Sequence, residues 1–268
     1  MATTKMSVVR PTTGDKMLNH TLDQISELRL LGLKAALIEQ MEQPGQYSEL
    51  AFEERLSLLI DQEVQDRKNR KIIRLLRNAK LKYKTAYLTD IDYHSARGLK
   101  KSIITSLSQK QWIDSYQNLI ITGPTGTGKT WLANALTNHF ITSGYSALYL
   151  RIAQLINEVA LVRVEGTYIK WLKKISRFQL LVLDDLGLTA LTTQQAQELL
   201  EVIEERSGAG SIIVTSQLPV KEWYSYFKNP TLADAIMDRL IHNSYRINLK
   251  GESMRKTKNS VNHSYTSE

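Results

Sequence analysis

The stretch L-I-I-T-G-P-T-G-T-G-K-T-W-L, residues 119–132, decides the fold of this chain. Its apolar start, residues 119–121, predicts a buried strand, and the residues after Lys129 carry apolar side chains at helical spacing. Between the two, residues 123–130 match G-x-x-x-x-G-K-[S/T], the phosphate-binding loop that joins a strand to a helix. The motif and its context together predict a site for a nucleoside triphosphate.

Each residue type in this loop has a physical role. Glycines allow tight turns and let successive backbone N–H groups approach phosphate oxygens, and the start of the following helix adds partial positive charge. Lys129 is expected to reach the β- and γ-phosphates, and the Thr130 hydroxyl to coordinate Mg²⁺. The residues predicted to bind the nucleotide are Gly123, Pro124, Thr125, Gly126, Thr127, Gly128, Lys129, Thr130 and Trp131.

A second apolar run, L-L-V-L-D-D at residues 180–185, ends in two carboxylates. At the carboxyl edge of a parallel sheet, Asp184 is expected to hold the Mg²⁺ shell through water, and Asp185 to orient or deprotonate the attacking water. Either aspartate alone is also typical of a helix cap, so the pair carries the prediction. The run I-I-V-T-S-Q at residues 212–217 is expected beside it, with Gln217 as the side chain that orients the water.

Two arginines further along the chain are candidates for contact with a γ-phosphate. Arg239 lies on a predicted helix, and Arg255 lies near the end of the chain. An arginine from a neighbouring subunit is one way to couple hydrolysis to assembly. A surface salt bridge is the alternative interpretation for either residue.

The composition of the 268-residue chain narrows its function. With 42% hydrophobic and 23% charged residues it is typical of a globular protein with one large or two modest domains. The absence of cysteine excludes disulfides and thiolate metal sites. No signal peptide or membrane span is recognisable, so we expect a cytoplasmic protein without a membrane partner. A net charge of +8 favours an anionic partner, nucleic acid first, over a protein that is merely basic.

Short apolar runs alternate with helical segments from residue 117 onward. This alternation predicts an α/β fold, a three-layer P-loop domain with a five-stranded parallel sheet, preceded by a small all-helical N-terminal domain. The runs expected to be strands are 119–122, 147–152, 180–184, 211–215 and 245–249. The predicted division is a flexible N-terminus at 1–19, a helical domain that binds DNA or a partner at 20–84, a linker at 85–100, the ATPase domain at 101–256 and a flexible tail at 257–268.

The predicted helix that leads to residue 84 becomes strongly basic in its second half. Acidic residues stop at Asp66 and resume at Asp90, so the positive charge between them lacks local compensation in the sequence. A solvated surface is the alternative to nucleic-acid contact. The residues predicted to contact DNA here are Arg67, Lys68, Arg70, Lys71, Arg74, Arg77 and Lys80.

With these motifs in this order, residues 20–256 resemble the IstB family of transposition helper ATPases, relatives of the DnaC helicase loaders within the AAA+ class. The resemblance implies ATP and Mg²⁺ as cofactors, and a homo-oligomer that assembles on duplex DNA with nucleotide at subunit interfaces and delivers a cognate transposase to its target. The residues that carry it are G-P-T-G-T-G-K-T (123–130), L-L-V-L-D-D-L-G (180–187), I-V-T-S-Q-L-P (213–219), M-D-R-L-I-H (237–242) and G-E-S-M-R (251–255).

The resemblance also implies roles for single residues. The Ser216–Gln217 pair corresponds to sensor 1 of AAA+ proteins, and Arg255 corresponds to sensor 2. Arg239 corresponds to the arginine finger, which acts on the nucleotide of a neighbouring subunit. Gln217 stands where relatives often have Asn, and Asp185 where typical AAA+ proteins have Glu, so hydrolysis is expected to be slow and stimulated by DNA or a partner. The helical pair predicted at 154–177 resembles an insertion that initiator-type ATPases use against DNA, and its basic residues are Lys170, Lys173, Lys174 and Arg177.

Three other functions remain open at this point. A replicative helicase loader would use the N-terminal helices to bind a helicase. A small-molecule phosphotransferase needs an arginine-bearing lid and an acceptor pocket, for which the sequence offers no obvious candidate. A DNA-binding scaffold would bind ATP with negligible turnover, and the paired aspartates argue weakly against it.

Overall fold

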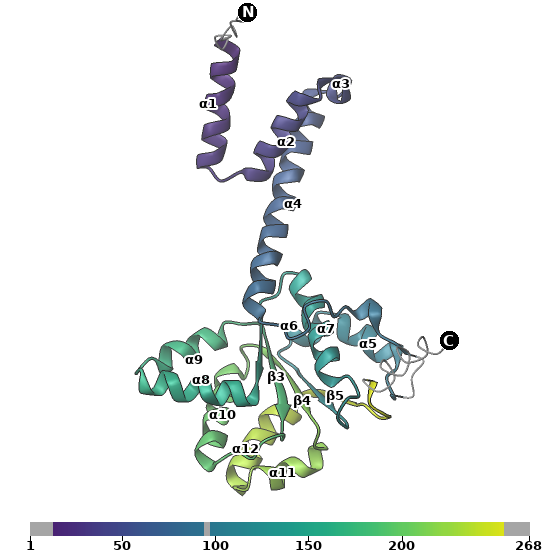
Figure 1. Cartoon of the computed structure of the whole chain (residues 1–268), viewed down its shortest axis with the longest axis vertical. Helices are drawn as coiled ribbons and strands as arrows, with labels where there is room; N and C mark the ends of the chain where they lie inside the picture. Colours follow the sequence, from purple (N-terminus) through teal and green to yellow (C-terminus); the bar gives the residue numbers. More distant parts are fainter. Residues whose placement is uncertain (1–12, 94–96, 255–268) are drawn as a thin grey trace, which may run out of the picture. The chain divides into compact units, whose positions relative to one another are not determined.

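The computed structural model describes residues 13–93 and 97–254, and Figure 1 shows its helices and strands. The chain divides into two compact units, Met1–Ile73 and Arg74–Glu268. The division lies within helix α4 (Phe52–Ala79), earlier than the predicted boundary after residue 84. The physical reason is that Ala79 and Leu81 are buried in the core of the second unit.

The first unit is helical, as predicted. Its helices are α1 (Thr13–Glu27), α2 (Leu31–Glu42), α3 (Pro44–Tyr47) and the first part of α4. Helix α1 begins inside the segment predicted to be flexible, while residues 1–12 lie outside the described part of the chain. Arg29 has a positive φ of 57° between α1 and α2, a conformation that does not continue a right-handed helix, so the chain forms two helices here.

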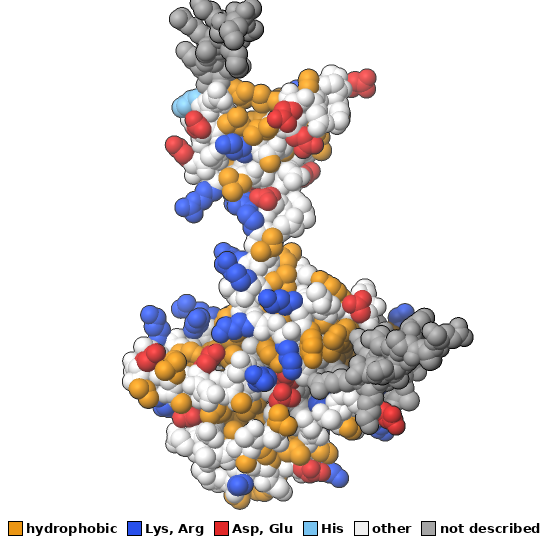
Figure 2. Space-filling model, in the orientation of Figure 1, with side chains coloured by type: hydrophobic (Ala, Val, Ile, Leu, Met, Phe, Trp, Pro, Cys, Tyr) orange, Lys and Arg blue, Asp and Glu red, His pale blue; other side chains and the backbone are white. Residues whose placement is uncertain are grey.

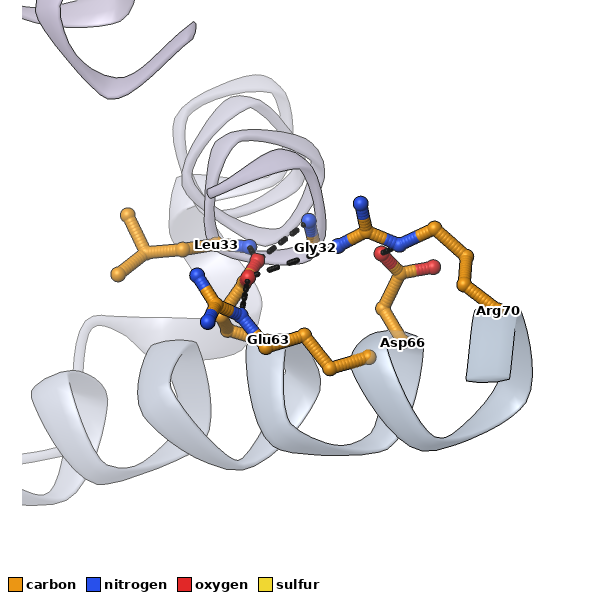
Figure 3. A network of polar contacts seen from close by, with 6 residues as sticks. Gly32, Leu33, Glu63, Asp66 and Arg70 are labelled. Carbon is orange, nitrogen blue, oxygen red and sulfur yellow. Dashed lines mark hydrogen bonds and ion pairs between the residues drawn. The ribbon is translucent and has the colours of Figure 1, made fainter. Parts of the chain in front are cut away.

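The first unit is held together by close contact between the start of α2 and the middle of α4. Gly32 is buried there, and a Cβ at this position would lie 2.7 Å from the Cβ of Asp66. The Glu63 carboxylate accepts hydrogen bonds from the N–H groups of Gly32, at 2.8 Å, and Leu33, at 3.1 Å (Figure 3). These N–H groups belong to the first turn of α2 and have no partner within that helix, so Glu63 satisfies them.

The second unit contains one five-stranded parallel sheet in the order β2-β3-β4-β1-β5, which confirms the predicted fold class. The strands are β1 (Asn118–Thr122), β2 (Ala147–Arg151), β3 (Leu180–Leu186), β4 (Ser211–Ser216) and β5 (Ser244–Asn248). The longer helices are α5 (Lys101–Ser108), α7 (Lys129–Thr142), α8 (Ile152–Val164), α9 (Tyr168–Ser176), α10 (Thr193–Arg206) and α12 (Pro230–Ile241). The short ones are η1 (Leu88–Asp90), α6 (Gln111–Asp114), η2 (Val220–Glu222) and α11 (Trp223–Tyr226).

Helices cover both faces of this sheet, which gives three layers (Figure 1). Leu119 and Ile121 of β1 belong to the core that includes α5, α6 and α7, whereas Ile120 belongs to the core that includes α8, α10 and α12. Because both faces of β1 to β4 are largely buried, these strands are mostly apolar rather than alternating, whereas the edge strand β5 is mostly exposed. A buried polar side chain in one of these strands therefore points to a specific hydrogen-bonding role.

The segment at 85–100 differs from the predicted linker. Ala86, Ile91 and Leu99 are buried, and Ile91 and Leu99 contribute to the core beside α7. Asn138 of α7 donates a hydrogen bond to the carbonyl of Ala86 at 3.0 Å, and Asn134 accepts one from the N–H of Tyr83 at 3.2 Å. The described part of this segment is therefore packed onto the core of the second unit, whereas residues 94–96 are outside the described chain.

The helical pair predicted at 154–177 is present as α8 and α9, inserted between β2 and β3. Arg163 at the end of α8 forms ion pairs with Glu198, at 3.2 Å, and Glu201, at 3.0 Å, on α10. Buried Arg206 donates to the carbonyl of Ile175 in α9 at 2.9 Å. These contacts fix the insertion to the domain. Among the described residues, no helix has both the length and the apolar character that a membrane crossing requires.

Candidate nucleotide-binding site

The phosphate loop connects β1 to α7 at the carboxyl edge of the sheet. Gly128 precedes α7 with a φ of 93°, a conformation that residues with a Cβ rarely adopt. Gly123, at a φ of 145°, leaves no room for a side chain, because a Cβ there would lie 2.3 Å from the carbonyl oxygen of Leu249. The predicted glycines are thus required by backbone conformation and by close contact with the chain after β5.

Lys129 is the first residue of α7 and is only 6% exposed. Its Nζ donates to the carbonyl oxygens of Gly123, at 2.7 Å, and Pro124, at 2.8 Å. The ammonium group is therefore folded over the loop that is predicted to hold the phosphates. A nucleotide bound by the loop N–H groups would bring phosphate oxygens within reach of the same ammonium group.

Asp184 is fully buried near the carboxyl end of β3, on the strand two places from the loop strand. Thr130 donates to its two carboxylate oxygens at 2.9 and 3.1 Å, so the structure brings together the two residues predicted to serve Mg²⁺. A hydroxyl and a carboxylate beside a phosphate loop are the oxygen ligands that Mg²⁺ takes when it also binds phosphates. The donor set therefore fits the ion.

Asp184 also accepts hydrogen bonds from two residues that sequence analysis missed. The hydroxyl of Tyr149 on β2 donates to its Oδ2 at 2.5 Å, and the hydroxyl of Thr215 on β4 donates to its Oδ1. Burial and the neighbouring Asp184 raise the pKa of Tyr149 well above its usual value, so the phenol keeps its proton and remains a donor. The available signal was a hydroxyl side chain near the carboxyl end of each of two mainly apolar strands.

Asp185 lies at an irregularity in the sheet. The register between β3 and β4 shifts between Leu183 and Leu186, and Asp185 itself has a φ of 65°. Such bulges re-aim a side chain next to functional sites. The Asp185 N–H donates to the Thr215 hydroxyl at 3.1 Å, so Thr215 contacts both aspartates.

The environment of Asp185 suits a group that accepts a proton. Partial burial is the main cause that raises the pKa of Asp185 above its usual value, and the negative charge of Asp184 raises it further. The positive charges of Lys82, Lys129 and Arg151 oppose this shift. A raised pKa makes a carboxylate a stronger base once it is ionised. Gln217 is partly buried just after β4, and its role as the water-orienting residue stays a prediction.

The chain after β5 lies against the phosphate loop. The N–H of Met254 donates to the carbonyl of Gly126 at 3.0 Å, and a Cβ on Gly126 would lie 2.1 Å from Oγ of Ser253. The N–H of Lys250 donates to the carbonyl of Arg97, whose own guanidinium is near Gly128. The motif G-E-S-M-R is thus brought to the loop through Met254, while Arg255 lies outside the described residues.

Arg239 lies away from the phosphate loop of its own chain. Its carbonyl accepts a hydrogen bond at 3.0 Å from Asn118, the first residue of β1, whereas the loop follows the last residue of that strand. Its guanidinium forms an ion pair with Glu204 at 2.7 Å and donates to the carbonyl of Ala235 at 3.1 Å. The salt bridge offered as the alternative interpretation is therefore present in the single chain.

The basic residues of α4 are partly compensated, which corrects the reading from sequence. Arg67 pairs with Glu63 at 2.6 Å, and Arg70 pairs with Asp66 at 2.7 Å, each one helical turn earlier (Figure 3 shows the Glu63 and Arg70 contacts). Burial alone would raise the pKa of Glu63, but the hydrogen bonds from Arg67 and from the start of α2 outweigh burial and lower it. The other predicted DNA contacts on α4, which are Lys68, Lys71, Arg74 and Arg77, are exposed.

Several basic residues of the second unit lie on α9 and near the end of α4. Figure 2 shows Lys and Arg side chains over α9 and around the end of α4. Lys80 lies 3.6 Å from Glu158 of α8, so it joins the end of α4 to the insertion. The residues of α9 and its C-terminal cap predicted to contact DNA, all exposed, are Lys170, Lys173, Lys174 and Arg177.

A phosphate loop, paired carboxylates near the end of a strand two places away in the sheet, and a parallel sheet with this strand order define a P-loop ATP-binding protein of the AAA+ class. Solved structures share this fold. DnaI matches with a TM-score of 0.52 at 23% identity, covering 66% of this chain and 93% of that chain. The DnaC helicase loader matches with a TM-score of 0.52 at 20% identity, covering 63% of this chain and 98% of that chain.

Within this class, the family model described as IstB-like ATP binding protein matches residues 23–262, and the chain belongs to that family. A putative insertion sequence ATP-binding protein, y4pL, of Sinorhizobium fredii is 43% identical over 241 residues, which cover 90% of this chain and 98% of the relative. The putative ATP-binding protein of insertion sequence IS1162 of Pseudomonas fluorescens is 44% identical over 203 residues, covering 76% of this chain and 87% of the relative. The resemblance stated from sequence is confirmed.

Proposed function

We propose that this protein is a DNA-dependent ATPase that acts as a switch in the transposition of an insertion sequence. ATP at subunit interfaces builds a homo-oligomer on duplex DNA, the assembly delivers or stimulates a transposase at the target, and hydrolysis resets it. The observation that carries the proposal is the meeting of Thr130, Asp184 and Asp185 beside the phosphate loop, with Arg239 held at the other edge of the same sheet.

The site supports hydrolysis of the terminal phosphate. The loop N–H groups and Lys129 bind the phosphates, and Thr130 and Asp184 hold Mg²⁺, which offsets phosphate charge when it is bound with the nucleotide. Asp185, with its raised pKa, accepts the proton of the attacking water. An aspartate is shorter than the glutamate of typical AAA+ proteins, so we expect slow turnover that DNA or a partner accelerates.

The position of Arg239 supports assembly. An arginine near the first residue of β1 does not reach a nucleotide held beyond the last residue of the same strand. In a head-to-tail oligomer, the same arginine faces the nucleotide of the next subunit. Each site is then complete only in the assembly, which makes hydrolysis depend on oligomerisation.

The basic surface of the second unit supports contact with the DNA backbone. The exposed cations of α9 and its C-terminal cap lie along one inserted element that Arg206 and Arg163 anchor to the domain. Phosphate contacts from lysine and arginine give affinity without sequence preference, and the affinity falls with salt. In the first unit, exposed Lys68 and Lys71 add positive charge, whereas Arg67 and Arg70 are engaged by carboxylates.

The transposase partner rests on the relatives, whose names place them in insertion sequences. A helicase loader remains the second candidate, because the structures of DnaI and the DnaC helicase loader share the fold. Pull-down of the ATP-bound protein against a transposase encoded in the same insertion sequence and against the host replicative helicase separates the two. Selective capture of the helicase would replace the transposase in the proposal.

Light scattering tests the switch itself. The protein is sized with and without duplex DNA, in ADP and in a non-hydrolysable ATP analogue, at fixed and stated salt. We expect a DNA-bound assembly only with the analogue. Lys129→Ala should abolish assembly by removing nucleotide binding, while Lys110→Ala, at an exposed lysine remote from the loop, should assemble normally. A monomer that ignores DNA in every nucleotide state would refute the proposal.

A further inference from the structure

Tyr149 is a buried side chain of β2 that belongs to neither nucleotide motif. It is 5% exposed, its ring packs in the core beside α7, and its hydroxyl is 2.5 Å from Oδ2 of Asp184. A phenylalanine would fill the same apolar space. The hydroxyl group therefore serves the carboxylate rather than the packing of the core.

The hydrogen bonds to Asp184 come from both sides of its strand. In the sheet order β2-β3-β4, Tyr149 lies on one neighbouring strand and Thr215 on the other. Tyr149 donates to Oδ2 and Thr215 to Oδ1, so the carboxylate is clamped between its two neighbours. Thr130, from the start of α7, contacts both oxygens from a third direction.

We propose that Tyr149 is a positioning residue, which holds the Asp184 carboxylate in the orientation that serves Mg²⁺ together with Thr130. The inference rests on the proposed function, because it takes Asp184 and Thr130 as the magnesium residues. Groups that hydrogen-bond a metal-binding carboxylate orient it, and their loss typically weakens metal binding about 10- to 100-fold. A phenol at Oδ2 leaves the carboxylate fewer ways to rotate when the nucleotide arrives.

The test is the magnesium requirement of nucleotide binding in Tyr149→Phe. A fluorescent, non-hydrolysable ATP analogue is bound to the full-length protein while Mg²⁺ is titrated from a chelated starting point. We expect the Mg²⁺ concentration at half-maximal binding to rise about tenfold or more, while binding of the analogue in chelator stays at the wild-type level. Tyr145→Phe is the matched control, because its hydroxyl donates to Asp114 at 2.8 Å, away from the loop, and should leave the requirement unchanged.

A second pair of variants protects the test against a simple folding defect. Thr215→Val removes the hydroxyl on the opposite side of Asp184 and should also raise the Mg²⁺ requirement. Thr215→Ser keeps a hydroxyl there and should show the wild-type Mg²⁺ requirement. A wild-type Mg²⁺ requirement in folded Tyr149→Phe overturns the positioning role and leaves the ATPase proposal intact. Failure of the wild-type protein to bind the analogue at any Mg²⁺ concentration overturns the proposed function, and this inference with it.

Discussion

Replacement of Arg239 by alanine separates a role in folding from a role in a neighbouring active site. In the single chain, the guanidinium pairs with Glu204 at 2.7 Å, but the two side chains are 33% and 44% exposed. Solvent screens such a pair, so it contributes about 0.5 kcal/mol, roughly a twofold change in an equilibrium. Assembly can therefore break the pair at little cost, and Arg239→Ala should barely change the unfolding temperature.

The expected effect on hydrolysis is much larger. An arginine that reaches a γ-phosphate from a neighbouring subunit contributes about 10³- to 10⁵-fold to the rate. DNA-stimulated phosphate release by Arg239→Ala should therefore fall to near background, while binding of an ATP analogue stays at the wild-type level. Glu204→Gln, which removes only the resting partner, should change the rate no more than about threefold. Arg246→Ala is the control, at an exposed arginine of β5.

Mixing two inactive variants shows whether Arg239 acts in trans. Asp185→Asn keeps Arg239 but lacks the proton acceptor, and Arg239→Ala keeps Asp185 but lacks the finger. If subunits mix at random in equal amounts, about a quarter of the interfaces combine an intact Asp185 with an intact neighbouring Arg239. Partial recovery of hydrolysis is the expected result. Hydrolysis by Arg239→Ala alone at the wild-type DNA-stimulated rate would refute the reasoning.

Further predictions concern pH, DNA and the first unit. Burial and Asp184 raise the pKa of Asp185, and the base works only when it is ionised, so the rate of hydrolysis should fall on acidification at a pH above the ordinary pKa range of an aspartate. A rate that stays constant down to that range would exclude Asp185 as the base. Lys173→Ala should reduce the slope of the logarithm of DNA affinity against the logarithm of salt concentration by about one phosphate contact. Arg67→Ala should reduce this slope less, because Arg67 already pairs with Glu63, and equal slopes for the two variants would contradict the assignment. Glu63→Ala should destabilise the first unit by about 2 kcal/mol, because the N–H groups of Gly32 and Leu33 lose their acceptor. All 4 tryptophans lie beyond residue 73, so this loss should appear in helical circular dichroism and leave the tryptophan fluorescence transition unchanged; a shift of both would show that the units unfold together.

Local sequence was enough to predict the phosphate loop, the strand that ends in Asp184 and Asp185, and the parallel sheet. The reason is that glycine conformation, strand burial on two faces and the spacing of the motifs are properties of short segments. The ion pairs of Arg67 and Arg70 are also local, since each partner stands four residues earlier on the same helix, and they were readable from the sequence. Without these ion pairs, α4 has more uncompensated positive charge than the structure shows.

Contacts between distant segments were decided only by the tertiary structure. Tyr149 and Thr215 reach Asp184 because β2 and β4 flank β3, an order that no single segment encodes. The segment at 85–100 reads as a linker because its apolar residues are sparse, yet Asn138 of α7 donates a hydrogen bond to the backbone carbonyl of Ala86, and Ile91 and Leu99 are buried in the core. The sequence by itself thus determined the phosphate-loop motif and the family to which the chain belongs. The packing of strands and loops decided which side chains orient the carboxylates, because hydrogen bonds across a sheet depend on strand order and register rather than on sequence spacing.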